Sequence, residues 1–193
     1  MKNLIYAVLF TLLFSQAAFA DDKKEAEEVL KGKLEQVILV LEKKELKEEP
    51  KKKEIIEIVT PMFDFSLMSK LTLGKKHWPG LTKQQKGKFT ELFTKRLKDS
   101  YLDKMLLYTD EKIEYKESVQ VGKKVQIPTI LTSKDNKISM LYKLYKSKQD
   151  WKIYDIEIQG VSLISTYRSQ FDEILRSKTV DDLLLKLEKP ENK

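Results

Sequence analysis

The stretch that decides the fold lies between Lys112 and Gln159, and it contains Ile138-Ser139-Met140-Leu141-Tyr142-Lys143-Leu144 and then Trp151-Lys152-Ile153-Tyr154-Asp155-Ile156-Glu157-Ile158. Every second residue of the first segment is apolar, which is the period of a β-strand with one buried face. In the second segment the apolar positions change phase after Ile153, which indicates a β-bulge, a twist or a strand buried on both faces. Turn-forming residues divide the region into four predicted strands, over residues 112–120, 123–133, 138–147 and 151–159. Their short connections require antiparallel neighbours.

Helical patterns flank these strands on both sides. The strongest covers residues 82–108, where Thr82 and Gln85 have the spacing of a capping box. Other positions indicate helix boundaries: Thr60 before Pro61 as an N-cap, Gly74 as a left-handed C-cap, and Thr179 as the N-cap of the last helix.

Together these elements predict a single α+β domain, with a four-stranded antiparallel meander sheet covered by N- and C-terminal helices. The helix over residues 82–108 carries a bulky apolar stripe that repeats every four residues: Phe89, Phe93, Leu97, Tyr101 and Met105. Such bulk serves either a fully packed core or the wall of an apolar cavity, and periodicity alone favours the packed core.

The first twenty residues have the features of an export signal. Lys2 is followed by an apolar run from Leu4 to Phe14, and Ala18-Phe19-Ala20 provides the small-x-small triplet that a signal peptidase requires. The apolar run is too short to span a bilayer. We therefore predict a cleaved signal peptide over residues 1–20 and a mature, unanchored domain over residues 21–193.

The composition excludes several classes of function. There is no Cys and a single His, His77, so disulfides, thiol nucleophiles and multi-histidine metal sites are excluded. The formal net charge is +7, which loss of Lys2 with the leader would lower to +6. A basic exported protein is expected to meet anionic membranes or acidic proteins, and no nucleic acid.

Several motifs resemble those of the MlaC family, which includes the toluene-tolerance proteins of the periplasm. The first is Phe63-Asp64-Phe65-Ser66-Leu67-Met68-Ser69-Lys70 with Leu71-Thr72-Leu73-Gly74, and the last is Gly160-Val161-Ser162-Leu163-Ile164-Ser165-Thr166-Tyr167-Arg168-Ser169-Gln170-Phe171. Between them, in the same order, stand Trp78, Leu81-Thr82-Lys83-Gln84-Gln85, Phe89, Phe93, Tyr101, Tyr108 and Trp151-Lys152-Ile153-Tyr154-Asp155. The resemblance runs from Phe63 to Leu187.

The resemblance implies a periplasmic phospholipid carrier with neither a cofactor, a metal nor a catalytic residue. Family members enclose an apolar pocket for the acyl chains of a glycerophospholipid and leave the headgroup near solvent. They exchange lipid with an outer-membrane lipoprotein complex and with an inner-membrane ABC transporter complex that carries an MCE subunit. The exchange maintains the lipid asymmetry of the outer membrane. We expect the carrier to be a monomer.

Bulky apolar residues of the helices and strands are the candidates for the lipid-binding lining, since flexible Met and large aromatic side chains adapt to varied acyl chains. They are Met68, Leu71, Leu73, Phe89, Phe93, Leu97, Tyr101, Met105, Met140, Tyr142, Leu144, Ile156, Ile158, Leu163 and Tyr167.

Lys70 and Arg168, together with Tyr167, are candidates for the mouth of the pocket, where a cation would meet a phosphate. For Arg168, an ion pair with Asp172 four residues further on is an equal alternative.

Two other functions stay open. One is an enzyme or small-ligand binder on an NTF2-like α+β cone, in which Asp155 and Glu157 beside Tyr154 would be the acid–base candidates. A solvated or structurally paired strand face explains these carboxylates better. His77 has no visible partner in the sequence and is expected to be a surface or packing residue. The other function is a closed-core scaffold protein of the envelope, which, unlike a carrier, would purify without lipid.

Overall fold

The computed structural model describes residues 2–106, 112–133, 136–148 and 150–190. Its helices are α1 (Lys2–Leu41), α2 (Glu48–Val59), α3 (Phe65–His77), α4 (Lys83–Leu106), α5 (Leu163–Leu175) and α6 (Val180–Glu188), and short 3-10 turns cover Thr60–Met62 and Trp78–Gly80. Its strands are β1 (Lys112–Tyr115), β2 (Val119–Val121), β3 (Lys124–Ser133), β4 (Asn136–Ser147), β5 (Asp150–Ile158) and β6 (Val161–Ser162).

The strands form one open antiparallel sheet in the order β1-β3-β4-β5-β6, and β2 pairs with β3 on the same edge as β1. This confirms the α+β class and the antiparallel sheet, but the described residues form six strands where four were predicted. The predicted first strand is divided into β1 and β2 by residues 116–118, and within this break the buried side chain of Ser118 donates a hydrogen bond to Glu27 of α1. The other addition, β6, pairs with the end of β5 after a turn with positive φ at Gln159 and Gly160.

The phase change in β5 is a β-bulge at Tyr154. The ladder between β4 and β5 passes from Asp155 directly to Ile153, so Tyr154 is an extra residue in β5. Because of this insertion, Ile153 and Ile156 both join the buried cluster on one face of the sheet, although they are three residues apart. Of the alternatives that the sequence pattern left open, the bulge is therefore confirmed.

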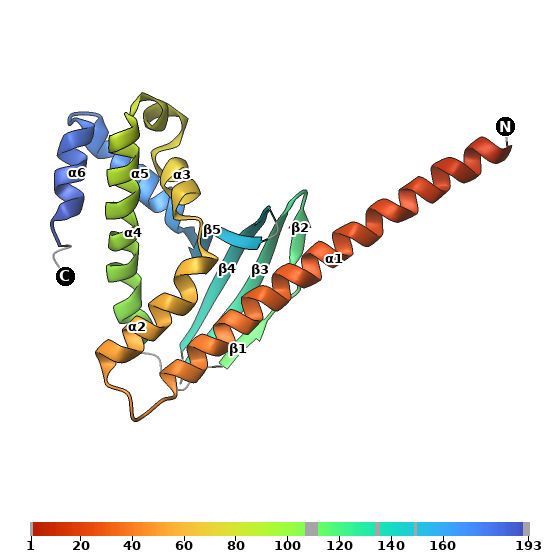
Figure 1. The fold of residues 1–193 in the computed structure, drawn as a ribbon, viewed down its shortest axis with the longest axis horizontal. Coiled ribbons are helices and arrows are strands. Elements are labelled where there is room, and N and C mark those ends of the chain that lie inside the picture. The colour runs from red at the N-terminus through yellow and green to blue at the C-terminus, as the bar shows by residue number, and fades with distance from the viewer. Residues whose placement is uncertain (1, 107–111, 134–135, 149, 191–193) are drawn as a thin grey trace.

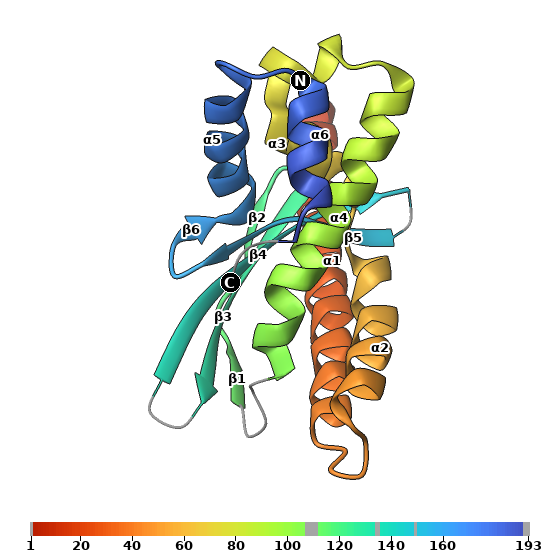
Figure 2. The same ribbon diagram turned by 90° about the vertical axis from the view of Figure 1, so that its left-hand side faces the viewer.

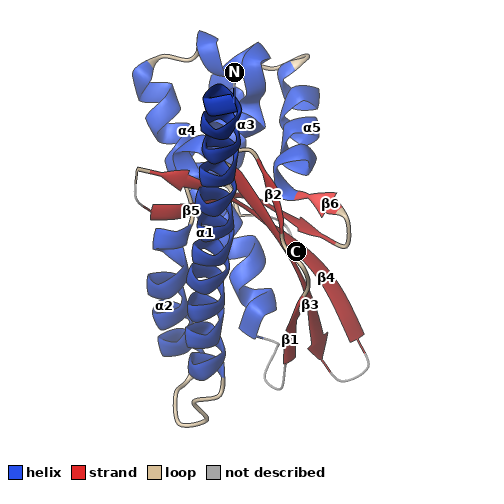
Figure 3. Ribbon diagram, turned by 90° about the vertical axis from the view of Figure 1, so that its right-hand side faces the viewer, coloured by secondary structure: helices blue, strands red, loops and turns tan. Residues whose placement is uncertain are grey.

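Helix α1 crosses one face of the sheet, which we call the inner face (Figures 1 and 3). The helix is fixed there by Glu25, whose carboxylate accepts hydrogen bonds from Lys146 Nζ at 2.6 Å and from the Trp151 indole nitrogen at 3.1 Å. Lys146 also reaches Asp22 at 2.9 Å. The first residues of the predicted mature chain are thus tied to β4 and β5.

The predicted signal peptide forms the N-terminal half of α1. This part of the helix projects beyond the rest of the chain (Figure 1). Cleavage after Ala20 stays a prediction. Within the described residues, no helix is both long enough and apolar enough to cross a membrane.

Helices α3 to α6 form a helical layer beside the sheet, in which α5 packs on α3 and α6 packs on α4 (Figures 1 and 2). The predicted capping box at the start of α4 is confirmed, because the amides of Thr82 and Gln85 each donate to the other residue's side-chain oxygen at 3.1 Å. The predicted cap at Thr179 is also confirmed, and it forms a second capping box with Asp182.

Two helix boundaries differ from the predictions. Helix α3 is capped by Asp64, whose carboxylate accepts from the Leu67 amide at 2.8 Å, and not by Thr60. The amide of Asp64 donates to the Ile153 carbonyl of β5 at 3.0 Å, and this bond fixes where the chain enters the helix. Thr60 lies in a 3-10 turn, where its buried hydroxyl has no hydrogen-bond partner among the described residues. Gly74 has the predicted left-handed φ, 63°, but the helix resumes after it.

Candidate functional site

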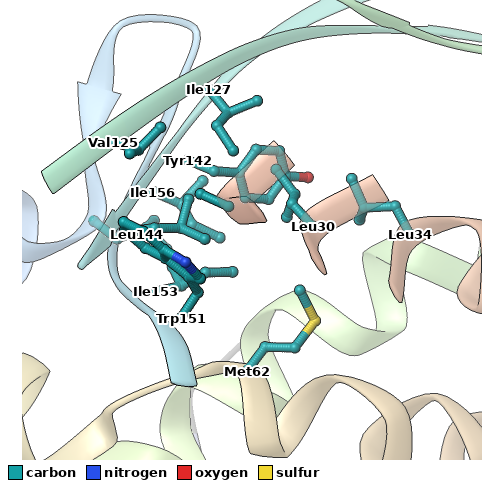
Figure 4. Close-up of a cluster of buried hydrophobic side chains, with 12 residues drawn as sticks. Leu30, Leu34, Met62, Val125, Ile127, Tyr142, Leu144, Trp151, Ile153 and Ile156 are labelled. Carbon is teal, nitrogen blue, oxygen red and sulfur yellow. The ribbon is translucent and has the colours of Figure 1, made fainter. Parts of the chain in front are cut away.

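Most buried apolar side chains of the described residues belong to two clusters. The sheet cluster joins α1 to the inner face (Figure 4), and its buried members are Ala26, Leu30, Leu34, Met62, Val125, Ile127, Tyr142, Leu144, Trp151, Ile153, Ile156 and Leu163. The helical cluster lies within the helical layer, and its buried members are Met68, Leu73, Leu81, Phe89, Leu92, Phe93, Leu97, Ile164, Tyr167, Phe171, Leu183 and Leu187.

The structure divides the predicted lining residues between these clusters. The sheet cluster, with the residues packed against it, takes Met140, Tyr142, Leu144, Ile156, Ile158 and Leu163. The helical cluster takes Met68, Leu71, Leu73, Phe89, Phe93, Leu97 and Tyr167. Tyr101 of α4 packs against both clusters. The side chain of Met105 lies outside the described part of the chain.

The helical cluster is packed from within by aromatic rings. Phe93 stacks on Phe89 with 5.7 Å between ring centroids, and it meets Tyr167 edge-to-face at 5.1 Å and Phe171 at 5.9 Å. Phe89 and Phe93 are both 0% exposed. These side chains bury their apolar surface against one another, as the residues of a closed core do.

The sheet cluster, in contrast, is closed at one end and less covered at the other. Along β4, Leu144 is 1% exposed, whereas Met140, which lies four residues earlier in the strand on the same face, is only half-buried. The strand register places Met140 in one row with Tyr115 of β1, Thr129 of β3 and Ile158 of β5. Thr129 is buried, whereas the three larger side chains of the row are half-buried. We define the half-buried surface as the side chains around this row: Tyr101, Ile113, Tyr115, Met140 and Ile158.

Sequence reasoning missed Ile113 and Tyr115 of this surface. Both lie in the first predicted strand, and their spacing of two residues places them on one face. That spacing was the available signal. Charged residues occupy the alternate positions of the strand, so the segment is polar on average and its two apolar residues were not included in the predicted lining.

Polar groups border the half-buried surface on the side of α1. The Tyr142 hydroxyl donates to the Met140 thioether at 3.6 Å. Burial raises the pKa of Tyr142, and burial together with the nearby Glu35 carboxylate raises the pKa of Tyr115 to about 12. Both phenols therefore stay neutral donors at physiological pH. The ammonium group of Lys31 lies 6.0 Å from the centroid of the Tyr115 ring.

The two predicted mouth cations lie in the helical layer. Lys70 on α3 and Arg168 on α5 are both exposed. Arg168 Nε donates to the Leu71 carbonyl of α3 at 2.9 Å, and the predicted alternative, an ion pair between Arg168 and Asp172, is wrong. Asp172 is occupied by other cations, because Lys76 Nζ lies at 2.7 Å and Arg176 at 3.6 Å.

His77, for which the sequence showed no partner, also contacts Asp172. Its Nε2 atom lies 2.8 Å from the Asp172 carboxylate, across the contact between α3 and α5. The hydrogen bonds from Lys76 and His77 lower the pKa of Asp172 to about 2. These contacts of Asp172 with Lys76 and His77 join α5 to α3, and we call the three residues the latch.

The carboxylates of β5 are held in structural contacts. Asp155 is 5% exposed and accepts from Lys143 at 3.1 Å, from the Ser162 hydroxyl at 2.8 Å and from the Ile164 amide at 3.2 Å. Lys143 also pairs with Glu157. These contacts join β4 and β5 to the start of α5, as the paired strand face predicted. In the part of the chain that the structure describes, no group of three or more acidic or histidine side chains could hold a metal ion.

Two surface grooves lie away from the sheet cluster. One, of about 890 Å³, lies between α4, α5 and α6 and is lined by residues that include Arg96, Tyr167 and Lys186. The other, of about 540 Å³, lies between α2 and α4 and is bordered mainly by charged side chains. Both grooves are thus distinct from the half-buried surface.

The family model described as MlaC protein matches residues 31–189. The chain belongs to the MlaC family. The match includes the end of α1, from Lys31 to Leu41, which the motifs alone did not reach. A solved structure of a phospholipid-binding protein from Ralstonia solanacearum, in complex with a phospholipid, has the same fold with a TM-score of 0.74. It is 21% identical to this MlaC chain, and the alignment covers 84% of this chain and 94% of that one.

Proposed function

We propose that this MlaC protein is a periplasmic carrier of glycerophospholipid that places the acyl chains against the half-buried surface. The observation that carries the proposal is the incomplete burial of Tyr115, Met140 and Ile158 on the inner face, next to a fully packed core at Leu144. A family member with this fold has been solved with a phospholipid, which supports the choice of ligand.

A carrier needs such a surface because acyl chains do not cross water unaided. Each exposed methylene group costs about 0.8 kcal/mol, so two long chains cost on the order of 20 kcal/mol. The side chains of Met140, Tyr101 and Ile113 offer flexible and aromatic contacts that tolerate chains of varied length. The ammonium group of Lys31 lies 6.0 Å from the centroid of the Tyr115 ring, and we propose it as a contact of the lipid phosphate.

The cellular role that we propose follows the family. The carrier exchanges lipid between an outer-membrane lipoprotein complex and an inner-membrane MCE/ABC transporter complex, and so maintains outer-membrane lipid asymmetry. It acts as a monomer without catalysis, cofactor or metal. The export signal over residues 1–20 supports the compartment, and the basic charge suits contact with anionic membrane surfaces.

Native mass spectrometry of the mature protein, purified without detergent, tests this function. We expect a bound mass that lipid extraction identifies as phospholipid, near one ligand per chain. A bare chain mass that persists after incubation with phospholipid vesicles would contradict the carrier function and favour a closed scaffold. Cross-linking to the two membrane complexes in an envelope extract would test the partners separately.

A further inference from the structure

The hydroxyl of Tyr142 is a polar group in apolar surroundings. Tyr142 is 7% exposed and belongs to the sheet cluster. Its ring reaches from β4 toward α1, and the fully buried Leu30 of α1 belongs to the same cluster (Figure 4). A tyrosine hydroxyl buried in this way ordinarily finds an oxygen or nitrogen partner.

The partner that the structure offers is weak. Among the described residues, the Met140 thioether at 3.6 Å is the hydroxyl's one hydrogen-bond acceptor. Sulfur of a thioether is a poor acceptor, so the donor capacity of the phenol is largely unused. Met140 is half-buried and belongs to the half-buried surface. The hydroxyl therefore sits at the boundary between the closed core and the proposed lipid site.

We propose that the Tyr142 hydroxyl donates a hydrogen bond to an ester carbonyl oxygen of the bound phospholipid. This inference rests on the proposed lipid-binding function and adds a polar contact to it. Binding would exchange the thioether for a carbonyl oxygen, and Met140, as a flexible side chain, can move aside for it.

The chemistry of the site favours an ester over a phosphate. A phosphate carries charge, and its burial among the apolar side chains of the sheet cluster around Tyr142 would be costly. An ester carbonyl is neutral, and in a diacyl lipid it is the polar group directly attached to each acyl chain. It therefore follows the chains to the edge of an apolar site, where a neutral phenol matches it.

The test compares ester-linked and ether-linked lipids. Protein stripped of lipid is incubated with vesicles that contain equal amounts of diacyl- and dialkyl-phosphatidylglycerol with the same chain lengths, and the bound lipids are counted by mass spectrometry. The two lipids differ in the carbonyl groups, and Tyr142→Phe removes the hydroxyl alone. We expect the diester-to-diether ratio of the wild type to exceed that of Tyr142→Phe by about two- to tenfold, the range of one net hydrogen bond.

Tyr145→Phe is the matched control. Tyr145 lies three residues further along β4, on the opposite face, where its hydroxyl donates to Asp64. This variant should keep the wild-type ratio. An equal ratio in wild type and Tyr142→Phe would overturn the inference.

Other outcomes separate the inference from the function on which it rests. If the wild type takes up both lipids without a preference for the diester, the ester contact is wrong and the carrier function stands. If it takes up neither lipid, the carrier function itself fails. The wild-type measurement needs no variant, so a missing diester preference rejects the inference even if Tyr142→Phe does not fold.

Discussion

Arg168 of α5 donates a hydrogen bond from Nε to the carbonyl oxygen of Leu71 in α3, at 2.9 Å. Leu71 lies three residues before Gly74, where the positive φ breaks the helix. At such a break the guanidinium supplies a hydrogen-bond donor to a carbonyl oxygen of the turn before it. The residue expected at the mouth of a lipid pocket thus stabilises a helix end in the helical layer.

Arg168→Gln should therefore lower the free energy of unfolding by about 1 kcal/mol, because a hydrogen bond at an exposed helix end is lost. Urea denaturation of lipid-free protein measures the loss. Lipid content of the folded variant should equal that of the wild type. The control is Arg176→Gln at the C-cap of the same helix, because the ion pair of Arg176 with Asp172 at 3.6 Å is largely exposed and worth little. Loss of lipid at unchanged stability would return Arg168 to the binding site.

Met140→Trp should reduce bound lipid while the fold is kept. Met140 is half-buried, so a larger ring can occupy the half-buried surface without displacing packed neighbours. Leu144→Trp is the contrasting variant, because Leu144 is 1% exposed and overpacking there should cost about 1–3 kcal/mol of stability. Lipid extraction and thermal unfolding of both variants provide the comparison. Normal lipid content in folded Met140→Trp would place the acyl chains elsewhere.

Phe93→Ala should lower the free energy of unfolding by about 3–5 kcal/mol, because it opens a cavity among the rings of the helical cluster. The folded fraction should still carry wild-type amounts of lipid. Met140→Ala should do the reverse, with a smaller loss of stability and a larger loss of lipid. These paired measurements sort the predicted lining residues by cluster. A lipid-free but stable Phe93→Ala protein would argue for a ligand inside the helical layer.

The latch at Asp172 predicts a pH dependence. Its pKa is lowered from 3.8 to about 2, chiefly by Lys76 and then by His77. A group with a lower pKa in the folded state adds stability above the pKa of the unfolded state, and that stability is lost as the pH falls from about 4 to 2. Asp172→Asn should therefore flatten the decline of stability over this interval.

Denaturation midpoints at several pH values between 2 and 5 measure the effect of Asp172→Asn. Lys76→Met, which removes the leading partner, should reproduce part of it. A decline of wild-type steepness in Asp172→Asn would show that the latch contributes no pH dependence.

Sequence patterns predicted the local features of this fold. The capping box of Thr82 and Gln85 is encoded within four neighbouring residues, so no distant partner is needed to find it. The change of phase after Ile153 is also visible in the sequence, but the register with β4 was needed to choose the bulge over a twist or a strand buried on both faces. The cap of α3 was different, since Thr60 and Asp64 both suit the position. A bond from Asp64 to Ile153, far along the chain, decides between them.

The site was less predictable for a related reason. Periodicity shows that Phe93 and Tyr142 each belong to a buried face, but it does not show that the two faces pack in different clusters. The role of Arg168 depends on a helix break at Gly74 on another helix. The half-buried surface depends on how far α1 and α4 cover the sheet, which is a property of the assembled fold.

The division into two clusters has a consequence for how a ligand could leave. Tyr101 and Phe63 are the residues that pack against both clusters, so the contact between them is narrow within the described chain. A protein built in this way can open one unit locally while the other keeps its protection against hydrogen exchange. Release of a lipid would then loosen α1 from β1 and β4 and leave α3 to α6 intact. The free energy required for each transfer would be that of a partial opening, which is well below the free energy of global unfolding.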